Sequence, residues 1–282
     1  MPRVAYQGEE GAYSEIAARQ SQALPALRGA SVTPMPCPSF TAVFEAVTTG
    51  AAEYGVVPVE NSLAGAVHQN VDLLLDSDLH VAGEVIVRVA HCLLGAPGGR
   101  LEDIRRAYSH PQALAQCQGS LERLGITPVA VYDTAGAAKQ LAIRPEPDAA
   151  AIASSRAGEI YGLQVLAENI EDEPFNFTRF FLLSRHEAPP RADGEEPRKT
   201  SIVFASRHQP GALLSCLAEL ANLNLSRIES RPRRDRAWSY LFTVDFEGDA
   251  RDPAPSAALA GLLRKAAFVK VLGSFPRAAE GA

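Results

Sequence analysis

The feature that most constrains the fold is a junction that recurs along the first 186 residues: a short apolar run ends in small polar residues and leads into a helix-like stretch. In the first example the run 3–7 meets the glycine-containing turn 8–14, and in the last the run 149–153 meets Ser154 and Ser155. Similar junctions follow the runs that end near Val59, Tyr108 and Tyr132. Short strands that alternate with helices are typical of α/β domains with a largely parallel sheet. The chain therefore predicts an α/β fold.

The same junctions predict where an anion binds. The carboxyl ends of parallel strands lie along one sheet edge, where helix N-termini present unpaired N–H groups and a partial positive charge. The Ser, Thr and Asp residues at these junctions are also good helix caps, and capping alone accounts for most such residues. A formal net charge of −6 argues against a nucleic-acid binder, which needs a basic surface. We expect a small anion to be held locally, by several helix starts and one Arg.

A linker is predicted at 187–198, which reads EAPPRADGEEPR, because apolar residues almost vanish there. It separates a larger region at 1–186 from a smaller domain at 199–282. The smaller domain reads strand, helix, strand, strand, helix, strand, which is the ferredoxin-like βαββαβ plan. The predicted strands are 200–205, 225–232, 238–247 and 269–275, and the predicted helices are 210–222 and 255–267.

Two stretches of the smaller domain depart from its apolar pattern. In the loop 208–213, reading HQPGAL, Gly211 at a helix start allows an amino-acid ligand to approach the backbone closely. In the strand 228–232, reading IESRP, the Glu, Ser and Arg side chains can meet the charged ends of such a ligand. The structural alternative is an ordinary helix N-terminus and an exposed edge strand.

The sequence offers no sign of a metal site, a membrane span or export. Structural zinc sites take closely spaced pairs of thiolates, whereas the four cysteines stand far apart. Gly, Pro or a charge interrupts every apolar run before the roughly 20 residues that a membrane helix requires. The chain begins without the basic and apolar segments of a secretory signal. We therefore expect reduced cysteines in a cytoplasmic protein.

Five segments in order resemble the prephenate dehydratase family, and the match runs over nearly the whole chain. They are AYQGEEGAYSE at 5–15, GVVPVENSLAGAV at 55–67, SHPQALAQC at 109–117, DTAGAA at 133–138 and NFTRFFLL at 176–183. The smaller domain resembles an ACT regulatory domain. Its matching pieces are GALL at 211–214, SRIESRP at 226–232 and YLFTVDFEG at 240–248.

The resemblance implies a fold and an activity. It implies that 1–186 forms a catalytic region of two α/β lobes, like a type II periplasmic binding protein, with the substrate in the cleft between them. The activity is the decarboxylating dehydration of prephenate to phenylpyruvate, CO2 and water in phenylalanine biosynthesis. Aromatisation of the ring drives this reaction. The enzyme must supply only a proton for the departing hydroxyl and an orientation in which the ring carboxylate can leave as CO2. No metal, nucleotide or redox cofactor is therefore expected.

The resemblance also assigns roles in the catalytic region. Thr178 is the catalytic residue that donates to the leaving hydroxyl, and Arg179 anchors the pyruvyl carboxylate. Because a threonine hydroxyl is a poor acid at neutral pH, we expect Thr178 to act as an oriented donor or to relay a proton from His110 or Glu60. On sequence pattern alone Thr178 would be an ordinary strand residue. The other substrate-binding candidates are Phe180, as a wall against the ring, and Asn61, Ser62, Ser109, Gln112 and Thr134, as hydrogen-bonding residues.

In the ACT-like domain, the resemblance implies that phenylalanine binds at an interface between two copies and regulates the enzyme allosterically. The expected assembly is a homodimer or homotetramer joined through these domains, with no nucleic-acid or membrane partner. The candidate phenylalanine-binding residues are Gly211, Ala212, Leu213, Glu229, Ser230, Arg231 and Pro232.

Two other functions remain open at this level. The segments at 5–15 and 109–117 also resemble arogenate dehydratases, which act on the aminated form of the same skeleton. A non-catalytic amino-acid sensor, built from a solute-binding fold and an ACT-like unit, is the alternative from another class. Turnover distinguishes the sensor from either enzyme.

Overall fold

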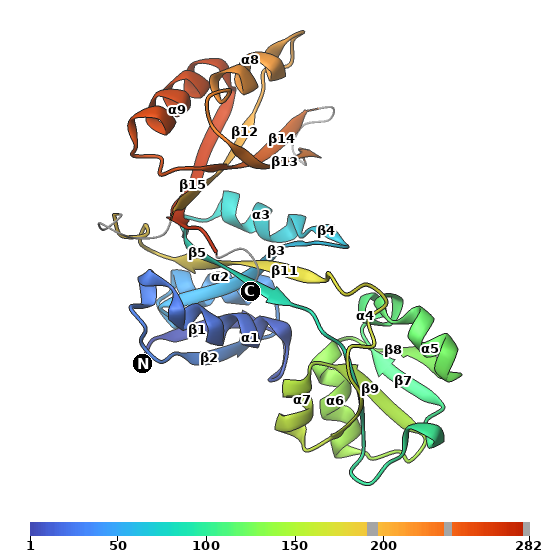
Figure 1. Ribbon diagram of the computed structural model, residues 1–282. Helices are drawn as coiled ribbons and strands as arrows, with labels where there is room; N and C mark the ends of the chain where they lie inside the picture. Colours follow the sequence, from blue (N-terminus) through green and yellow to red (C-terminus); the bar gives the residue numbers. More distant parts are fainter. Residues whose placement is uncertain (191–196, 234–238, 279–282) are drawn as a thin grey trace.

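The computed structural model describes residues 1–190, 197–233 and 239–278, and contains three β-sheets arranged along the molecule. Figure 1 shows the C-terminal sheet at one end, the first lobe in the middle and the second lobe at the other end. The predicted linker at 187–198 lies partly outside the described residues. Trp238, the predicted first residue of a strand, also lies outside them.

The first lobe is a sheet with the strand order β2-β1-β3-β11-β5, and the short strand β4 pairs with β3. Its strands are β1 (Arg3–Gln7), β2 (Thr33–Cys37), β3 (Tyr54–Asn61), β4 (Gly65–Ala66), β5 (His80–Arg88) and β11 (Phe177–Ser184). Its helices are α1 (Tyr13–Gln20), α2 (Phe40–Thr48) and α3 (His68–Asp76). The apolar runs that the sequence presented as strands form the buried core of this lobe.

The second lobe is a sheet with the strand order β10-β6-β9-β7-β8. Its strands are β6 (Cys92–Gly95), β7 (Arg106–Ser109), β8 (Thr127–Ala130), β9 (Ala149–Ala153) and β10 (Gln164–Ala167). Its helices are α4 (Pro111–Gln116), α5 (Gln118–Leu124), α6 (Thr134–Ile143) and α7 (Ser155–Tyr161). The chain enters this lobe between β5 and β6 and returns between β10 and β11, so two crossings join the lobes (Figure 1).

Each lobe mixes strand directions, whereas the sequence suggested largely parallel sheets. In the first lobe β1 runs parallel to β2 and β3, while β11 is antiparallel to both β3 and β5. In the second, β7 runs parallel to β8 and β9, while β6 is antiparallel to β9 and β10. The antiparallel strands are those next to the two crossings, where the chain runs out of one lobe and back. The predicted α/β class holds, since the remaining strands are joined through helices.

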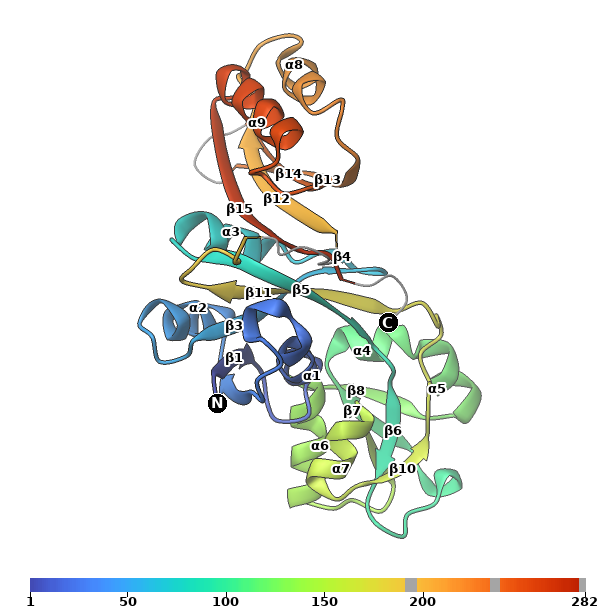
Figure 2. The same cartoon turned by 60° about the vertical axis from the view of Figure 1, so that its left-hand side comes forward.

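The C-terminal unit has the predicted βαββαβ order and an antiparallel sheet with the strand order β13-β14-β12-β15. Its elements are β12 (Arg198–Ala205), α8 (Ala212–Glu219), β13 (Leu225–Pro232), β14 (Tyr240–Glu247), α9 (Pro253–Lys265) and β15 (Phe268–Pro276). Helices α8 and α9 cover one face of this sheet, as the two views in Figures 1 and 2 show. Phe242, Val244 and Phe246 of β14 belong to the core on that face.

The other face of the C-terminal sheet packs against the first lobe. Val203, Leu241 and Phe275 belong to the same buried cluster as the core of the first lobe. The approach is close enough that a Cβ on Gly273 of β15 would lie 2.2 Å from the carbonyl oxygen of Val81 on β5. Glycine is required at this point because any side chain would strike backbone atoms. The C-terminal sheet is thus covered by its own helices on one face and by the catalytic region on the other.

A buried carboxylate in the C-terminal unit should make its stability depend on pH. Asp249 Oδ2 accepts hydrogen bonds from Arg251 Nη2 (2.6 Å) and from Arg198 Nη1 (2.8 Å). The Arg251 guanidinium, with help from Arg198, holds the pKa of the Asp249 carboxyl well below its usual range. A carboxyl whose pKa is lowered by folding stabilises the protein at pH values above its unfolded pKa, which is about 3.9, and loses this contribution as pH falls further.

We therefore expect the urea midpoint of unfolding to fall as the pH is lowered from about 4 to about 2, and Asp249→Asn to make this fall shallower. Circular dichroism during urea titration at each pH measures the midpoint. Equal pH dependence in the variant and the parent would show that Asp249 does not contribute to acid sensitivity.

Candidate active site between the lobes

A cavity of about 570 Å³ lies between the two lobes and collects side chains from both. The first lobe contributes the end of β3, the start of β11 and the starts of α2 and α3. The second contributes the starts of α4 and α6. The polar or ionisable residues that line it are Gln7, Tyr13, Ser39, Asn61, Gln69, His91, His110, Gln112, Gln116, Tyr132, Asp133, Thr134 and Thr178.

Thr178 and Asn61 face each other across the β3–β11 pair at the floor of this cavity. Asn61 Nδ2 donates to Thr178 Oγ1 (3.0 Å), and Asn61 Oδ1 accepts from the backbone N–H groups of Ala64 (2.8 Å) and Leu63 (3.1 Å). Because the Asn61 oxygen is occupied by these donors, its NH2 group is the one that faces Thr178. Asn61 also donates to Asn176 Oδ1 (2.8 Å), which is fully buried.

This arrangement orients the Thr178 hydroxyl group. One lone pair of Oγ1 accepts from Asn61, and among the described residues no acceptor receives the Thr178 hydroxyl proton. A hydroxyl group carries one donor and two acceptor positions, and the proton rotates to suit its partner. The proton of Thr178 is therefore available to a ligand in the cavity. Thr178 can act as an oriented hydrogen-bond donor, which is one of the two roles expected from the sequence.

Three of the helix starts at the cavity are capped by side chains. Ser39 caps α2 by accepting from the Ala42 N–H (3.2 Å), and Asp133 caps α6 by accepting from the Gly136 N–H (2.6 Å). His110 Nδ1 accepts from the Gln112 N–H (3.2 Å) at the start of α4. Helix N-termini carry about half a positive charge each. Among the described residues that line the cavity there is no Arg or Lys and one acidic side chain, Asp133, so the positive potential that an anion would meet comes from the helix starts.

Tyr13, His91 and Gln116 form a partly buried hydrogen-bonded group on the cavity wall that the sequence reasoning missed. His91 Nε2 lies 3.0 Å from Gln116 Oε1, and His91 Nδ1 lies 3.2 Å from Tyr13 Oη. Burial lowers the pKa of His91, although Gln116 and Glu171 oppose the shift, so its imidazole is neutral at pH 7. Its sequence signal was a lone His between two apolar strand runs, at the first crossing between the lobes.

Four predicted site residues therefore meet in the cavity: Thr178, Asn61, Gln112 and Thr134. His110, predicted as a relay or a turn residue, lines the cavity as well. Glu60, the other predicted relay, points elsewhere and lies 3.3 Å from Arg179.

The structure contradicts the predicted role of Arg179 as a carboxylate anchor in the cleft. Its guanidinium lies 2.6 Å from Asp245 Oδ2, 3.3 Å from Glu60 Oε2 and 3.4 Å from Glu84 Oε2. The physical reason is strand geometry: successive side chains of a strand point to opposite faces, so Arg179 points away when Thr178 faces the cavity. Burial disfavours its charge, but Asp245 and Glu84 outweigh this effect and raise the Arg179 pKa above its ordinary value.

Three other predicted contacts are also corrected. Phe180 is 2% exposed and belongs to the core of the first lobe, so it offers no wall to a ring in the cavity. Ser109 is fully buried and donates to the Ile152 carbonyl (2.7 Å). Ser62 Oγ donates to the Phe175 carbonyl (2.7 Å) and accepts from the Phe177 N–H (2.9 Å), which holds the loop before β11. Both serines satisfy backbone groups and do not line the cavity.

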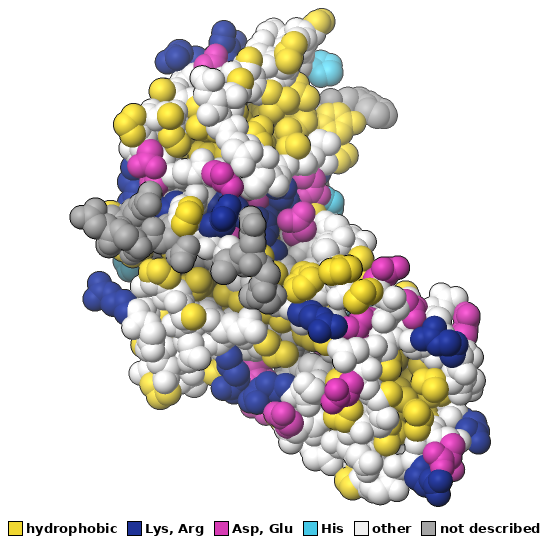
Figure 3. Space-filling view, in the orientation of Figure 1, with side chains coloured by type: hydrophobic (Ala, Val, Ile, Leu, Met, Phe, Trp, Pro, Cys, Tyr) yellow, Lys and Arg dark blue, Asp and Glu magenta, His cyan; other side chains and the backbone are white. Residues whose placement is uncertain are grey.

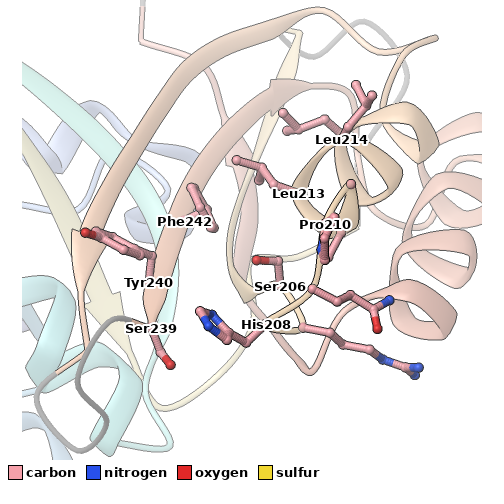
Figure 4. A pocket seen from close by; sticks show the side chains of 13 residues that line it. Ser206, His208, Pro210, Leu213, Leu214, Ser239, Tyr240 and Phe242 are labelled. Atoms are coloured by element: carbon pink, nitrogen blue, oxygen red, sulfur yellow. The ribbon is translucent and has the colours of Figure 1, made fainter.

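A second cavity, of about 750 Å³, lies in the C-terminal unit between the start of α8 and β14. Three of the residues predicted to bind phenylalanine, Gly211, Ala212 and Leu213, line it. Figure 4 shows Leu213 and Leu214 on one side and Tyr240 and Phe242 on the other, with Ser206 and His208 close by.

The other four predicted ligand-binding residues lie on β13, away from this cavity within one chain. Glu229 and Arg231 face the first lobe, where Glu229 contacts His68 and Arg231 contacts Asp72; Glu229 also contacts Arg227 of its own strand. Ser230 and Pro232 are exposed on the opposite face of the strand. A single chain therefore does not bring Glu229 and Arg231 to a ligand in the second cavity, because both side chains are engaged with the catalytic region.

In the described part of the chain, no helix is both long and apolar enough to cross a membrane. The four cysteines are buried and unpaired by disulfides. Among the described residues no three His, Cys, Asp or Glu side chains are grouped as metal ligands.

The chain is similar to known proteins over almost its full length. A family model described as prephenate dehydratase matches residues 4–188. An Arabidopsis thaliana protein named arogenate dehydratase/prephenate dehydratase 2, chloroplastic, is 46% identical over 285 residues, which cover 97% of this chain and 72% of that protein.

Two solved structures share the complete arrangement of lobes and C-terminal unit. One is described as prephenate dehydratase in complex with L-Phe from Arthrobacter aurescens; it is 34% identical, with a TM-score of 0.86, and the match covers 98% of this chain and 90% of that chain. The other, GqqA, is described as a novel type of quorum quenching acylase. It is 37% identical, with a TM-score of 0.87, and the match covers 98% of both chains.

Proposed function

The chain belongs to the prephenate dehydratase family, and from this premise we propose that it converts prephenate to phenylpyruvate, CO2 and water. The observation that carries the proposal is the Thr178 hydroxyl, fixed by Asn61 and directed into a cavity ringed by helix starts. The chain is a dehydratase of the arogenate and prephenate class, which acts in phenylalanine biosynthesis. The choice of prephenate, the cofactor-free chemistry and a cytosolic location are predictions.

The proposed reaction needs a proton at one end of the ring and loss of a carboxylate at the other. The Thr178 hydroxyl passes its proton to the departing hydroxyl group, which leaves as water while the ring carboxylate leaves as CO2 and its bonding electrons complete the aromatic ring. Asn61 stabilises the negative charge that develops on Thr178 Oγ1, and a proton from solvent restores the hydroxyl group. Donors that are already oriented before the reaction stabilise developing charge without reorganising. The neutral His91 next to Gln116 and Tyr13 keeps that wall of the cavity free of net positive charge.

The pyruvyl carboxylate is held by helix starts and neutral donors in place of Arg179, the anchor expected from the sequence. The starts of α4 and α6, with Gln112 and Thr134, offer N–H and side-chain donors to the pyruvyl carboxylate. A full cation beside the ring carboxylate would stabilise the charge that must leave, and so would slow the reaction by lowering the ground state. A cavity that is lined by partial charges avoids this penalty.

Arogenate dehydration is the second candidate function. Arogenate carries an ammonium group where prephenate has a keto group, and Asp133 is the acidic side chain among the described residues that line the cavity. Burial raises the pKa of Asp133, and a bound ammonium would favour its charged form. The name of the Arabidopsis relative covers both activities.

Turnover by chelator-treated protein tests the proposal. Prephenate should yield phenylpyruvate and CO2 in equal amounts. Product from arogenate alone would move the assignment to the second candidate. No product from either substrate, together with cleavage of an acylated amide, would instead favour the acylase activity ascribed to GqqA.

For regulation, we propose that phenylalanine binds in the cavity of the C-terminal unit and lowers turnover. The cavity has an apolar wall of Leu213, Leu214 and Phe242 that suits an aromatic side chain. The related structure from Arthrobacter aurescens is described as a complex with L-Phe. We expect a second copy of the chain to complete the site, because the exposed Ser230 and Pro232 lie on β13, an edge strand of the sheet. The resulting homodimer, or a homotetramer of two such pairs, is part of this proposal.

Leu214→Glu is expected to raise the phenylalanine concentration that gives half-inhibition at least about tenfold, because a carboxylate there would have to be desolvated by the ligand. Leu214 is 72% exposed, so the substitution should leave folding intact. The matched control is Leu263→Glu on α9, which is 62% exposed and outside the cavity. Inhibition assays on both variants measure the effect; equal half-inhibition in Leu214→Glu and the parent would place the effector elsewhere.

A further inference from the structure

A cluster of seven charged side chains joins the catalytic region to the C-terminal unit, and we call it the interdomain charge cluster. Its members are Glu60 on β3, Glu84 on β5, Arg179 on β11, Lys199 on β12, Arg227 and Glu229 on β13, and Asp245 on β14. Figure 3 shows acidic and basic side chains next to one another at this junction. The cluster is shared by two domains.

Arg179 lies at the centre of the cluster. It contacts two carboxylates of its own lobe, Glu60 and Glu84, and one carboxylate of the C-terminal unit, Asp245. The Glu84 and Asp245 side chains are fully buried, and that of Arg179 is 11% exposed. The contact with Asp245 is the shortest of the three, at 2.6 Å. A buried cation depends strongly on its partners, since water cannot replace a lost carboxylate.

The main chain connects this cluster directly to the catalytic hydroxyl. Thr178 and Arg179 are consecutive in β11. Thr178 pairs with Asn61 of β3, and Arg179 pairs with Glu60 of the same strand. The β3–β11 register shifts immediately after Arg179, at Phe180. A register shift locally disrupts the ladder of hydrogen bonds and bends the strand. The segment that carries Thr178 is therefore held on one side by Asn61 and on the other by the charge contacts of Arg179.

At its other end the cluster connects to the cavity of the C-terminal unit. Asp245 lies on β14, the strand whose Tyr240 and Phe242 line that cavity. Phe242 and Asp245 are three residues apart, a separation of about 10 Å along a strand. Phe242 points to the helix-covered face, whereas Asp245 points to the first lobe. A ligand that contacts Phe242 would therefore touch the same strand that carries Asp245, the residue that holds Arg179. The two side chains lie on opposite faces of that strand.

We infer that Arg179 is a positioning residue, through which the C-terminal unit sets the placement of Thr178 in the active site. The inference rests on the proposed function for its kinetic consequence. Asp245 holds Arg179 in the arrangement seen here, with Thr178 Oγ1 against Asn61. A displacement of β14 weakens that hold and loosens β11 at Thr178. Two links therefore couple the two cavities. The first is the contact between Asp245 and Arg179, and the second is the main chain between Arg179 and its neighbour Thr178.

Asp245→Asn tests the coupling from the C-terminal side. The substitution removes the charge that faces Arg179 but keeps an oxygen that can accept from Ser201 Oγ (2.6 Å). The matched control is Asp249→Asn, because Asp249 is a buried aspartate of the same unit that binds Arg198 and Arg251 and makes no contact with Arg179. Asp245→Glu, which restores the carboxylate, serves as the conservative rescue.

Asp245→Asn is expected to lower kcat at least about tenfold with KM changed by less than about threefold, because Thr178 acts in the transition state. Asp245→Glu should recover part of kcat, and Asp249→Asn should retain it. A second readout is amide hydrogen exchange over 176–184, which should accelerate in Asp245→Asn but not in Asp249→Asn. Loss of inhibition by phenylalanine in Asp245→Asn, with phenylalanine still bound in calorimetry, would further support the coupling.

Either of two results would overturn the inference. The first is an Asp245→Asn protein with the kcat and the exchange of the parent. The second is an equal loss in Asp245→Asn and Asp249→Asn, which would indicate general destabilisation of the C-terminal unit. If the parent turned over neither prephenate nor arogenate, the proposed function would fail while the exchange experiment still decided the inference.

Discussion

Replacing Thr178 with Val is expected to lower kcat for dehydration at least about 100-fold while KM changes by less than about threefold. Valine has the shape of threonine, but a methyl group takes the place of the hydroxyl. The substitution thus removes the proton that no described residue accepts and leaves the Asn61 amide facing a methyl group. Substrate carboxylates still meet the helix starts of the second lobe, so binding is retained.

Steady-state kinetics of Thr178→Val and Thr178→Ser measure this effect. Serine keeps the hydroxyl, and should retain turnover within about tenfold of the parent. A mainly raised KM in Thr178→Val would assign Thr178 to substrate binding. Equal losses in the Val and Ser variants would show that shape matters and the hydroxyl does not.

Gly11→Ala is expected to lower kcat/KM at least about 100-fold, because a misplacement of reacting groups by about 1 Å is enough for such a loss. Gly11 has φ +87°, and a Cβ on it would lie 2.7 Å from Cα of Ala157 on α7. The Gly11 carbonyl also accepts from Ser154 Oγ (2.6 Å) in the second lobe. The added methyl group therefore pushes the lobes apart, and moves Thr178 away from the starts of α4 and α6.

The control for this prediction is Gly29→Ala. Gly29 also has a positive φ, of +69°, but no atom lies within 4 Å of the position of its Cβ. Comparing kcat/KM and the thermal midpoint of both variants separates backbone strain from the collision with Ala157. Similar kinetics in the two variants would show that the contact between the lobes does not control the active site.

Much of the fold could be predicted from local pattern. The junctions after the apolar runs marked the strand ends, and Asp133 and Ser154 indeed cap α6 and α7. The βαββαβ order of the C-terminal unit followed from its alternation of apolar residues. Strand direction was harder: whether β5 and β11 run antiparallel depends on which strands become neighbours, and periodicity carries no information about that.

At the candidate site, some roles implied by the family resemblance agree with the structure and others do not. Thr178 and Asn61 came from different motifs, and the β3–β11 pairing brings them together. Arg179 could have been questioned from the sequence, since neighbours in a strand cannot both face one cleft. Its true partners could not be named, because Asp245 reaches it only through the docking of a separate domain. His91 was missed because a lone His between strands usually packs in a core.

The docking of the C-terminal unit connects its sheet to the strands of the first lobe. Because one face of its sheet is shared with the first lobe, any change in that sheet is felt at β5 and β11. Lys270 on β15 adds a second attachment, by donating to the carbonyls of Leu74 (2.8 Å) and Ser77 (2.6 Å) at the end of α3. The cavity proposed to bind an effector and the cavity proposed to turn over substrate therefore belong to one connected structure.

The most direct test of the proposed function is internal competition: wild-type protein receives equal concentrations of prephenate and arogenate in one reaction, and the consumption of each is followed. The ratio of the initial rates equals the ratio of kcat/KM. We expect prephenate to be consumed at least about tenfold faster and phenylpyruvate to accumulate. Preferential consumption of arogenate, or no consumption of either substrate, would contradict the assignment.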